Sequence, residues 1–128
     1  YETLEAYARS KTCNILFTRE LARRLAATPT TANCVHPGFV ASRFGRDGDL
    51  GFGPGLFFTL LRPIMISVER GADTPLWLAT SPEVVGRSGG YHHRRRLEEP
   101  AAFAKDATNE RALWVLSERL TGTSMEAA

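Results

Sequence analysis

The fold class is indicated by TANCVHP, residues 31–37, an uncharged stretch that ends at a proline. Because the residue before a proline is pushed toward extended geometry, we expect residues 31–36 to form a strand. The stretch does not alternate between apolar and polar residues, which is typical of strands covered on both faces of a parallel sheet. Before it, from about Thr3 to Ala26, there is no Gly or Pro and many helix formers, which predicts a long helix. A long helix followed by a buried strand indicates an α/β fold.

Beyond this stretch, the sequence predicts five more segments. They are a glycine-rich loop over 37–55, an interrupted apolar helix over 56–66, a helix from Val68 to Thr80, a last strand over 89–93 and an amphipathic helix from Asn109 to Leu120. Two strands cannot make the doubly wound parallel sheet that their buried character requires. The 128 residues are therefore expected to be the second half of one larger domain.

Charge and composition exclude several classes of protein. Sixteen Lys and Arg against fourteen Asp and Glu leave a net charge of +2, which gives no reason to expect nucleic acid or an anionic membrane as a partner. The most apolar stretch, 56–66, is broken by Arg and Pro and is far shorter than the roughly 20 residues that span a bilayer. Cys13 and Cys34 lie in apolar surroundings without metal-ligand spacing, so we expect reduced core cysteines, no metal site and a cytoplasmic protein.

Along the first predicted helix, the polar residues Tyr7, Lys11, Asn14 and Thr18 fall on one face. Tyr7 and Lys11 are one turn apart. A phenol is a poor proton donor or acceptor at neutral pH, and a neighbouring ammonium stabilises the phenolate. The pair suits general acid–base chemistry. Because Tyr-x-x-x-Lys also occurs by chance on solvated helices, the hypothesis depends on the surrounding sequence.

Four motifs supply that context. They are AYARSKTCNILF at 6–17, HPGFVAS at 36–42, ERGADTPLWLATSPE at 69–83 and SGGY at 88–91. With these motifs in this order, the sequence resembles the short-chain dehydrogenase/reductase family, in particular its retinol-dehydrogenase-like branch. The resemblance covers nearly the whole chain and is weakest over 43–66 and after residue 94.

The resemblance implies a Rossmann-like domain in which a nicotinamide cofactor lies across the carboxyl ends of parallel strands. By the same resemblance, Tyr7 is the proton donor and acceptor at the substrate oxygen. Lys11 activates Tyr7 and hydrogen-bonds the nicotinamide ribose. The reaction implied is the interconversion of an alcohol and a carbonyl.

Three further cofactor contacts follow from the HPGFVAS motif. Pro37, Gly38 and the backbone of Val40 would border the nicotinamide. Ser42, where the family often has Thr, could bond its carboxamide or the pyrophosphate. A Pro-Gly pair directly after a buried strand also lets bare backbone approach a flat ligand, which agrees with this assignment on physical grounds.

The family's Gly-rich turn, the residue that chooses between NAD and NADP, the Asn-Ala-Gly segment and the catalytic Ser all precede the Tyr. Only six residues precede Tyr7 here. We therefore expect residues 1–128 to be the C-terminal part of a single domain whose N-terminal cofactor-binding half is missing. The choice between NAD and NADP stays open, and the fragment alone is expected to be inactive.

The segment after Pro-Gly, about 42–67, is rich in Phe, Leu and Ile and would close over the substrate in the resembled family. An apolar pocket suits a lipophilic carbonyl or alcohol. Packing of this segment on the core or on a membrane surface is the alternative. A second hypothesis for the chain is a non-catalytic interaction module, because an uncovered sheet edge and apolar faces favour self-association. In the parent protein we expect a homo-oligomer.

Other constellations carry less weight. GRSGG at 86–90 fits the hydrolase pattern G-x-S-x-G but lacks its strand, turn and helix order. His92 and His93 are adjacent on a strand, so they point to opposite faces and are expected to form a basic edge with the arginines that follow rather than a metal site. His36 is interpreted as a satisfied strand-end histidine. Trp77 and Trp114 are expected in the core.

Overall fold

Three α-helices dominate the computed structural model, which describes residues 3–41 and 62–125. They are α1 (Thr3–Arg24), α3 (Val68–Thr80) and α4 (Ala107–Thr121). Between them lie the 3-10 helices η1 (Arg62–Ile64), η2 (Pro82–Val84) and η3 (Ala102–Lys105) and the strands β1 (Cys34–Val35), β2 (Tyr91–His93) and β3 (Arg96–Leu97).

Three of the four predicted helices, those over 3–26, 68–80 and 109–120, are confirmed as α1, α3 and α4. The bounds of α3 are those predicted, and α1 ends two residues before the predicted Ala26. Helix α4 begins at Ala107, earlier than predicted, because the Asp106 carboxylate accepts the backbone N–H groups of Thr108 and Asn109 at 2.7 and 3.4 Å. It ends at Gly122, whose φ of 68° places it in the left-handed region typical of a helix C-terminus.

The three strands form one mixed sheet in the order β1-β2-β3. Strands β1 and β2 are parallel, with Cys34 opposite Tyr91, and α3 connects them. The prediction of a buried strand over 31–36 is wrong in extent and burial, since only Cys34 and Val35 form the strand and both are half-buried. Before β1, the Ala32 N–H donates to the Ser88 hydroxyl, and the Asn33 side-chain amide donates to the Arg87 carbonyl. These residues therefore bind the loop before β2 instead of lengthening the strand.

The prediction that 89–93 is the last strand is also wrong. Strand β3 pairs antiparallel with β2, with His93 opposite Arg96. The two residues between them, Arg94 and Arg95, have φ of 50° and 59°, a backbone conformation in which such hairpin turns usually carry Gly or Asn. The Arg95 side chain is held by the Asp73 carboxylate, and its backbone N–H donates to the Thr74 hydroxyl at 3.2 Å.

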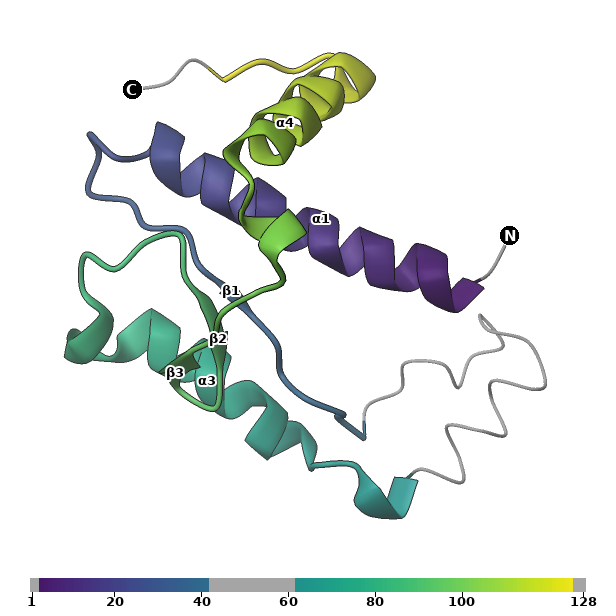
Figure 1. Cartoon of the computed structure of the whole chain (residues 1–128). Coiled ribbons are helices and arrows are strands. Elements are labelled where there is room, and N and C mark those ends of the chain that lie inside the picture. Colours follow the sequence, from purple (N-terminus) through teal and green to yellow (C-terminus); the bar gives the residue numbers. More distant parts are fainter. Residues whose placement is uncertain (1–2, 42–61, 126–128) are drawn as a thin grey trace.

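Figure 1 shows the strands between α1 and α4 on one side and α3 on the other. The buried apolar side chains Leu16, Ala104 and Trp114 lie where α1, η3 and α4 pack together. The expectation of a core position is met by Trp114, whereas Trp77 is only half-buried. Of the predicted loop over 37–55 and helix over 56–66, residues 42–61 lie outside the described part, and η1 occupies 62–64.

Candidate functional site

The N-terminal half of α1 presents Tyr7 and Lys11 to solvent. The Tyr7 residue is 46% exposed, and the Lys11 Nζ lies 5.1 Å from the centroid of the Tyr7 ring. Helical spacing brings them together, because residues four apart lie on one face. The neighbouring Ser10 hydroxyl donates to the Tyr7 carbonyl at 2.7 Å, so it is engaged with the helix backbone. The helix thus carries a phenol and an ammonium side by side on an open face.

The second part of the candidate site follows β1. Gly38 has φ of 88°, and a Cβ built there would lie 3.3 Å from Ile66 Cδ1 and 3.7 Å from the His93 ring. Bare backbone is therefore required at this position. Val40 forms a parallel bridge with Ile66. Ser42, the remaining predicted cofactor contact, lies outside the described residues.

The histidine before Pro37 is part of a stacked pair. The rings of His36 and His93 lie 5.0 Å apart with an interplanar angle of 24°, and the His93 Nδ1 is 2.9 Å from the His36 carbonyl oxygen. Burial lowers the pKa of His36, the His93 ring lowers it further, and Glu98 acts in the opposite direction. The interpretation of His36 as a strand-end histidine with a partner agrees with this arrangement.

The two parts of the site lie toward the same end of the fold. In Figure 1, α1 runs away from the N-terminus and β1 runs back, so the chain after β1 heads toward the side where α1 begins. In parallel sheets, ligands bind beyond the carboxyl ends of the strands. Pro37, Gly38 and Val40 follow such an end, and Tyr7 and Lys11 lie in the half of α1 nearer to it.

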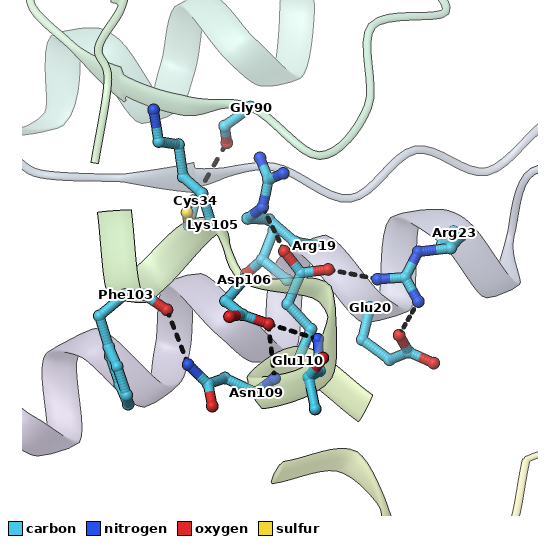
Figure 2. A network of polar contacts seen from close by, with 12 residues as sticks. Arg19, Glu20, Arg23, Cys34, Gly90, Phe103, Lys105, Asp106, Asn109 and Glu110 are labelled. Atoms are coloured by element: carbon cyan, nitrogen blue, oxygen red, sulfur yellow. Dashed lines mark hydrogen bonds and ion pairs between the residues drawn. The ribbon is translucent and has the colours of Figure 1, made fainter. Parts of the chain in front are cut away.

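Sequence reasoning missed a buried charge cluster that fixes α1 against α4. Glu110 is only 2% exposed, and its carboxylate accepts hydrogen bonds from the Arg19 Nε at 2.6 Å and from Arg23 (Figure 2). Arg23 also bonds Glu20, which accepts a further bond from the Arg24 Nε at 2.8 Å. Charged residues on helices are normally solvated, so no local pattern reveals this pairing across some 90 positions of sequence.

The competing constellations take structural positions. The Ser88 hydroxyl is bonded to the backbone of Ala32, so the G-x-S-x-G pattern presents no free nucleophile. His92 is buried against the Trp77 ring, whereas His93 stacks on His36, so the two imidazoles point apart as predicted. The expectation that both lie on a basic edge with the arginines is wrong for His92, which is buried. Within 3–41 and 62–125, no three His, Cys, Asp or Glu side chains cluster as metal ligands would.

Both cysteines are unpaired and half-buried. Burial raises the pKa of the Cys34 thiol, with a hydrogen bond to Thr18 opposing it. In the same described ranges, none of the helices is both long and apolar enough for a bilayer.

The chain's own residues fit a nicotinamide ring and its ribose. A flat ring needs backbone without a side chain in the way, and the φ of 88° at Gly38 makes glycine, which has no side chain, the residue favoured there. The ribose needs a hydrogen-bond donor on an open surface, which the exposed Lys11 ammonium offers.

No model of a known protein family matches the chain. Curated proteins do. The chain is 42% identical to human retinol dehydrogenase 14 over 123 residues, covering 95% of this chain and 37% of that protein. It is 41% identical over 121 residues to the human WW domain-containing oxidoreductase, covering 94% of this chain and 28% of that one. Mouse retinol dehydrogenase 13 is 36% identical over 131 residues, covering 98% of this chain and 38% of the relative.

The chain therefore spans about a third of the length of these relatives. Their names are those of dehydrogenases and oxidoreductases, and each match covers at least 94% of this chain. The resemblance is thereby confirmed: the chain is homologous to retinol-dehydrogenase-like members of the short-chain dehydrogenase/reductase family.

Proposed function

We propose that this chain is the part of an NAD(P)-dependent oxidoreductase that supplies its general acid–base pair, and that the enzyme interconverts an alcohol and a carbonyl. The observation that carries the proposal is the Lys11 ammonium lying 5.1 Å from the centre of the exposed Tyr7 ring. In a chain homologous to dehydrogenases, that pair is the acid–base machinery such a reaction needs. On this proposal the chain is the C-terminal part of a Rossmann-like, doubly wound domain.

Each residue then has a separate task. The Tyr7 hydroxyl donates its proton to the carbonyl oxygen during reduction and takes it back from the alcohol during oxidation. The Lys11 ammonium stabilises the phenolate left on Tyr7 and bonds the ribose. Pro37, Gly38 and the Val40 backbone border the nicotinamide, which when bound supplies or accepts the hydride.

The substrate proposed is lipophilic. The relatives include proteins named retinol dehydrogenases. Phe39, shortly before the segment about 42–67, is 57% exposed, and Ile64 within it is 74% exposed, so both offer an apolar side chain to a ligand or a partner. We expect kcat/KM to rise along a series of longer aliphatic aldehydes, with about 0.8 kcal/mol for each methylene that becomes buried. Equal turnover of short polar carbonyls would contradict the apolar pocket.

The acid–base proposal is tested in a chimaera in which this chain replaces the matching segment of human retinol dehydrogenase 14. We expect NAD(P)-dependent retinol oxidation that falls by about 10²-fold or more in Tyr7→Phe, because proton transfer by a positioned side chain typically contributes that much. Lys11→Met should also lower kcat.

Matched controls are Tyr91→Phe on β2 and Lys105→Met in the exposed ion pair with Glu99, neither of which belongs to the proposed site. A Tyr7→Phe chimaera as active as the parent chimaera would overturn the assignment.

The chain by itself is expected to show no turnover. The residues proposed here border only the nicotinamide end of the cofactor, and pyrophosphate binding in such enzymes uses a helix N-terminus after a glycine-rich turn. Carbonyl reduction by residues 1–128 alone that disappears in Tyr7→Phe would contradict this expectation.

A second candidate function is a non-catalytic oligomerisation module. The observation favouring it is the outer face of α4, where Val115, Leu116 and Leu120 are exposed, Leu120 by 75%. Light scattering should show self-association that Leu120→Glu weakens, whereas Val85→Glu, at an equally exposed position outside α4, leaves it unchanged. A monomer at high concentration removes this candidate.

A further inference from the structure

A glycine on the far side of the sheet from Tyr7 controls how closely the segment after β1 approaches α3. Gly71 lies in the first turns of α3 and is buried. A Cβ built on it would lie 2.6 Å from Val40 Cγ2 and 3.0 Å from Val40 Cγ1. Real Cβ atoms do not approach carbon so closely, so any side chain at position 71 would displace Val40.

Val40 is also tied to the start of α3 through the backbone. The Ala41 N–H donates to the Ile66 carbonyl at 2.9 Å, and the Ile66 N–H donates to the Phe39 carbonyl at 2.8 Å. Ser67, the next residue, caps α3 by accepting the Arg70 N–H. The backbone hydrogen bonds with Ile66 fix the register of residues 39–41. The absence of a side chain at Gly71 lets Val40 pack closely on α3 and so fixes the distance of these residues from the helix.

The same segment is confined at its other end. A Cβ built on Gly38 would lie 3.3 Å from Ile66 Cδ1 and 3.7 Å from the His93 ring, so little room is left beside the backbone there. An outward movement of Val40 would therefore be taken up by the backbone between Gly38 and the Val40–Ile66 bridge. Val40 and Gly38 are the positions whose backbone is proposed to border the nicotinamide.

We propose that Gly71 is a positioning residue for the backbone of residues 37–41. Because Gly71 has no side chain, Val40 can pack directly against α3, and this contact sets where the 37–41 backbone lies beside a nicotinamide ring. The functional part of this inference rests on the proposed function, and the geometric part stands on the Gly71–Val40 contact. Gly71 acts through Val40 and touches neither substrate nor cofactor.

The geometric part is tested in the full chain by amide hydrogen exchange. In Gly71→Ala, the amides of Ala41 and Ile66 should exchange about tenfold faster than in the unsubstituted chain, as expected when overpacking weakens a local pair of hydrogen bonds. Exchange in α4 should not change. Because Ala is the better helix former, a weaker helix cannot cause the effect.

The double variant Val40→Ala/Gly71→Ala supplies the rescue. Removing both Val40 Cγ atoms leaves only the Cβ, whose distance of 3.4 Å from the new methyl is ordinary contact. Exchange at Ala41 and Ile66 should return toward the original rate. The control Ala72→Val adds bulk at an exposed position of the same turn and should leave these rates unchanged. Unchanged exchange in Gly71→Ala, or no recovery in the double variant, would overturn the proposal.

The functional part is tested in the retinol dehydrogenase chimaera. Gly71→Ala should raise KM for the nicotinamide cofactor several-fold with little change in kcat, and Val40→Ala/Gly71→Ala should reverse the rise. A change confined to kcat overturns the functional part. A chimaera that shows no cofactor-dependent activity in any form counts against the proposed function instead, and the exchange experiment then decides the role of Gly71.

Discussion

The two halves of α1 share one helical backbone but have opposite surroundings. In the C-terminal half, Leu16 and Glu20 are buried against α4 and η3, and three arginines close the charge cluster around Glu20 and Glu110. In the N-terminal half, Tyr7 and Lys11 are exposed, and the ion pair between Arg9 and Glu5 lies in solvent. The packed half anchors the helix, while the open half presents chemical groups. Substitutions in the two halves should therefore separate stability from activity.

The largest expected effect lies in the packed half. In Glu110→Ala, the partly buried guanidinium groups of Arg19 and Arg23 lose the carboxylate that they share. Removing one partner of a fully buried ion pair typically costs about 3–5 kcal/mol of unfolding free energy. Here Arg19 and Arg23 are partly exposed and Arg23 keeps Glu20, so we expect a loss of about 2 kcal/mol, in the range of hydrogen bonds to charged groups. Chemical denaturation should show a loss of this size. The control is Glu5→Ala, which removes an exposed pair and should cost less than about 1 kcal/mol. Equal losses in the two variants would show that the halves do not differ in this way.

Acid should weaken the same packed region. Backbone N–H groups of Thr108 and Asn109 lower the pKa of Asp106, the residue that caps α4. A carboxyl with a lowered pKa in the folded state stabilises the fold above its ordinary pKa and loses that contribution as the pH falls through the folded value. Unfolding free energy should therefore decline below about pH 4. In Asp106→Asn, which can still cap but does not titrate, the decline should be shallower. An unchanged acid profile would exclude this role for Asp106.

Features that depend on residues close together in the sequence are predicted well, and features that depend on contacts between distant segments are not. Helix ends depend on nearby residues, so the predicted bounds of α1, α3 and α4 lie within two residues of those observed. The predicted start of α4 is too late because it leaves out the cap at Asp106. Strand β3 was missed because its turn is made by Arg94 and Arg95, which carry no turn signal although both have positive φ. Strand β1 is shorter than predicted because the residues before it, Ala32 and Asn33, form hydrogen bonds with the loop that contains Arg87 and Ser88 and do not continue the strand pairing.

The candidate site divides in the same way. The Tyr7–Lys11 contact is local, so helical spacing predicts it. The proximity of Gly71 to Val40 and the meeting of His36 with His93 depend on how distant segments pack, and no spacing reveals them. The roles of Tyr7, Lys11, Pro37, Gly38, Val40 and Ser42 in binding and catalysis stay predictions.

A smaller effect on stability is expected at His36, which directly follows β1. Burial and the neighbouring His93 lower the pKa of His36 in the folded chain. Below the ordinary histidine pKa of about 6.5, His36 then binds more protons in the unfolded chain than in the folded one. The contribution of His36 to the unfolding free energy is therefore fully present above that pH and is lost as the pH drops through the folded pKa. The midpoint of the His36 ring signals in an NMR titration should lie below 6.5, and His36→Gln should reduce the loss of stability between pH 8 and pH 5. A midpoint above 6.5 would reverse the sign.

The smallest effect on stability is expected for the groups proposed to carry the chemistry. Lys11→Met keeps most of the aliphatic stem and removes only an exposed ammonium, and Tyr7→Phe removes a hydroxyl from an exposed ring. Surface substitutions away from caps, cores and buried pairs usually change the unfolding free energy by less than about 0.5 kcal/mol. Denaturation of both variants in the full chain should stay within that range, while the chimaera carrying them loses activity. A loss comparable to that of Glu110→Ala would mean that the open half of α1 is part of the packing, and the decline in activity could then no longer be assigned to proton transfer.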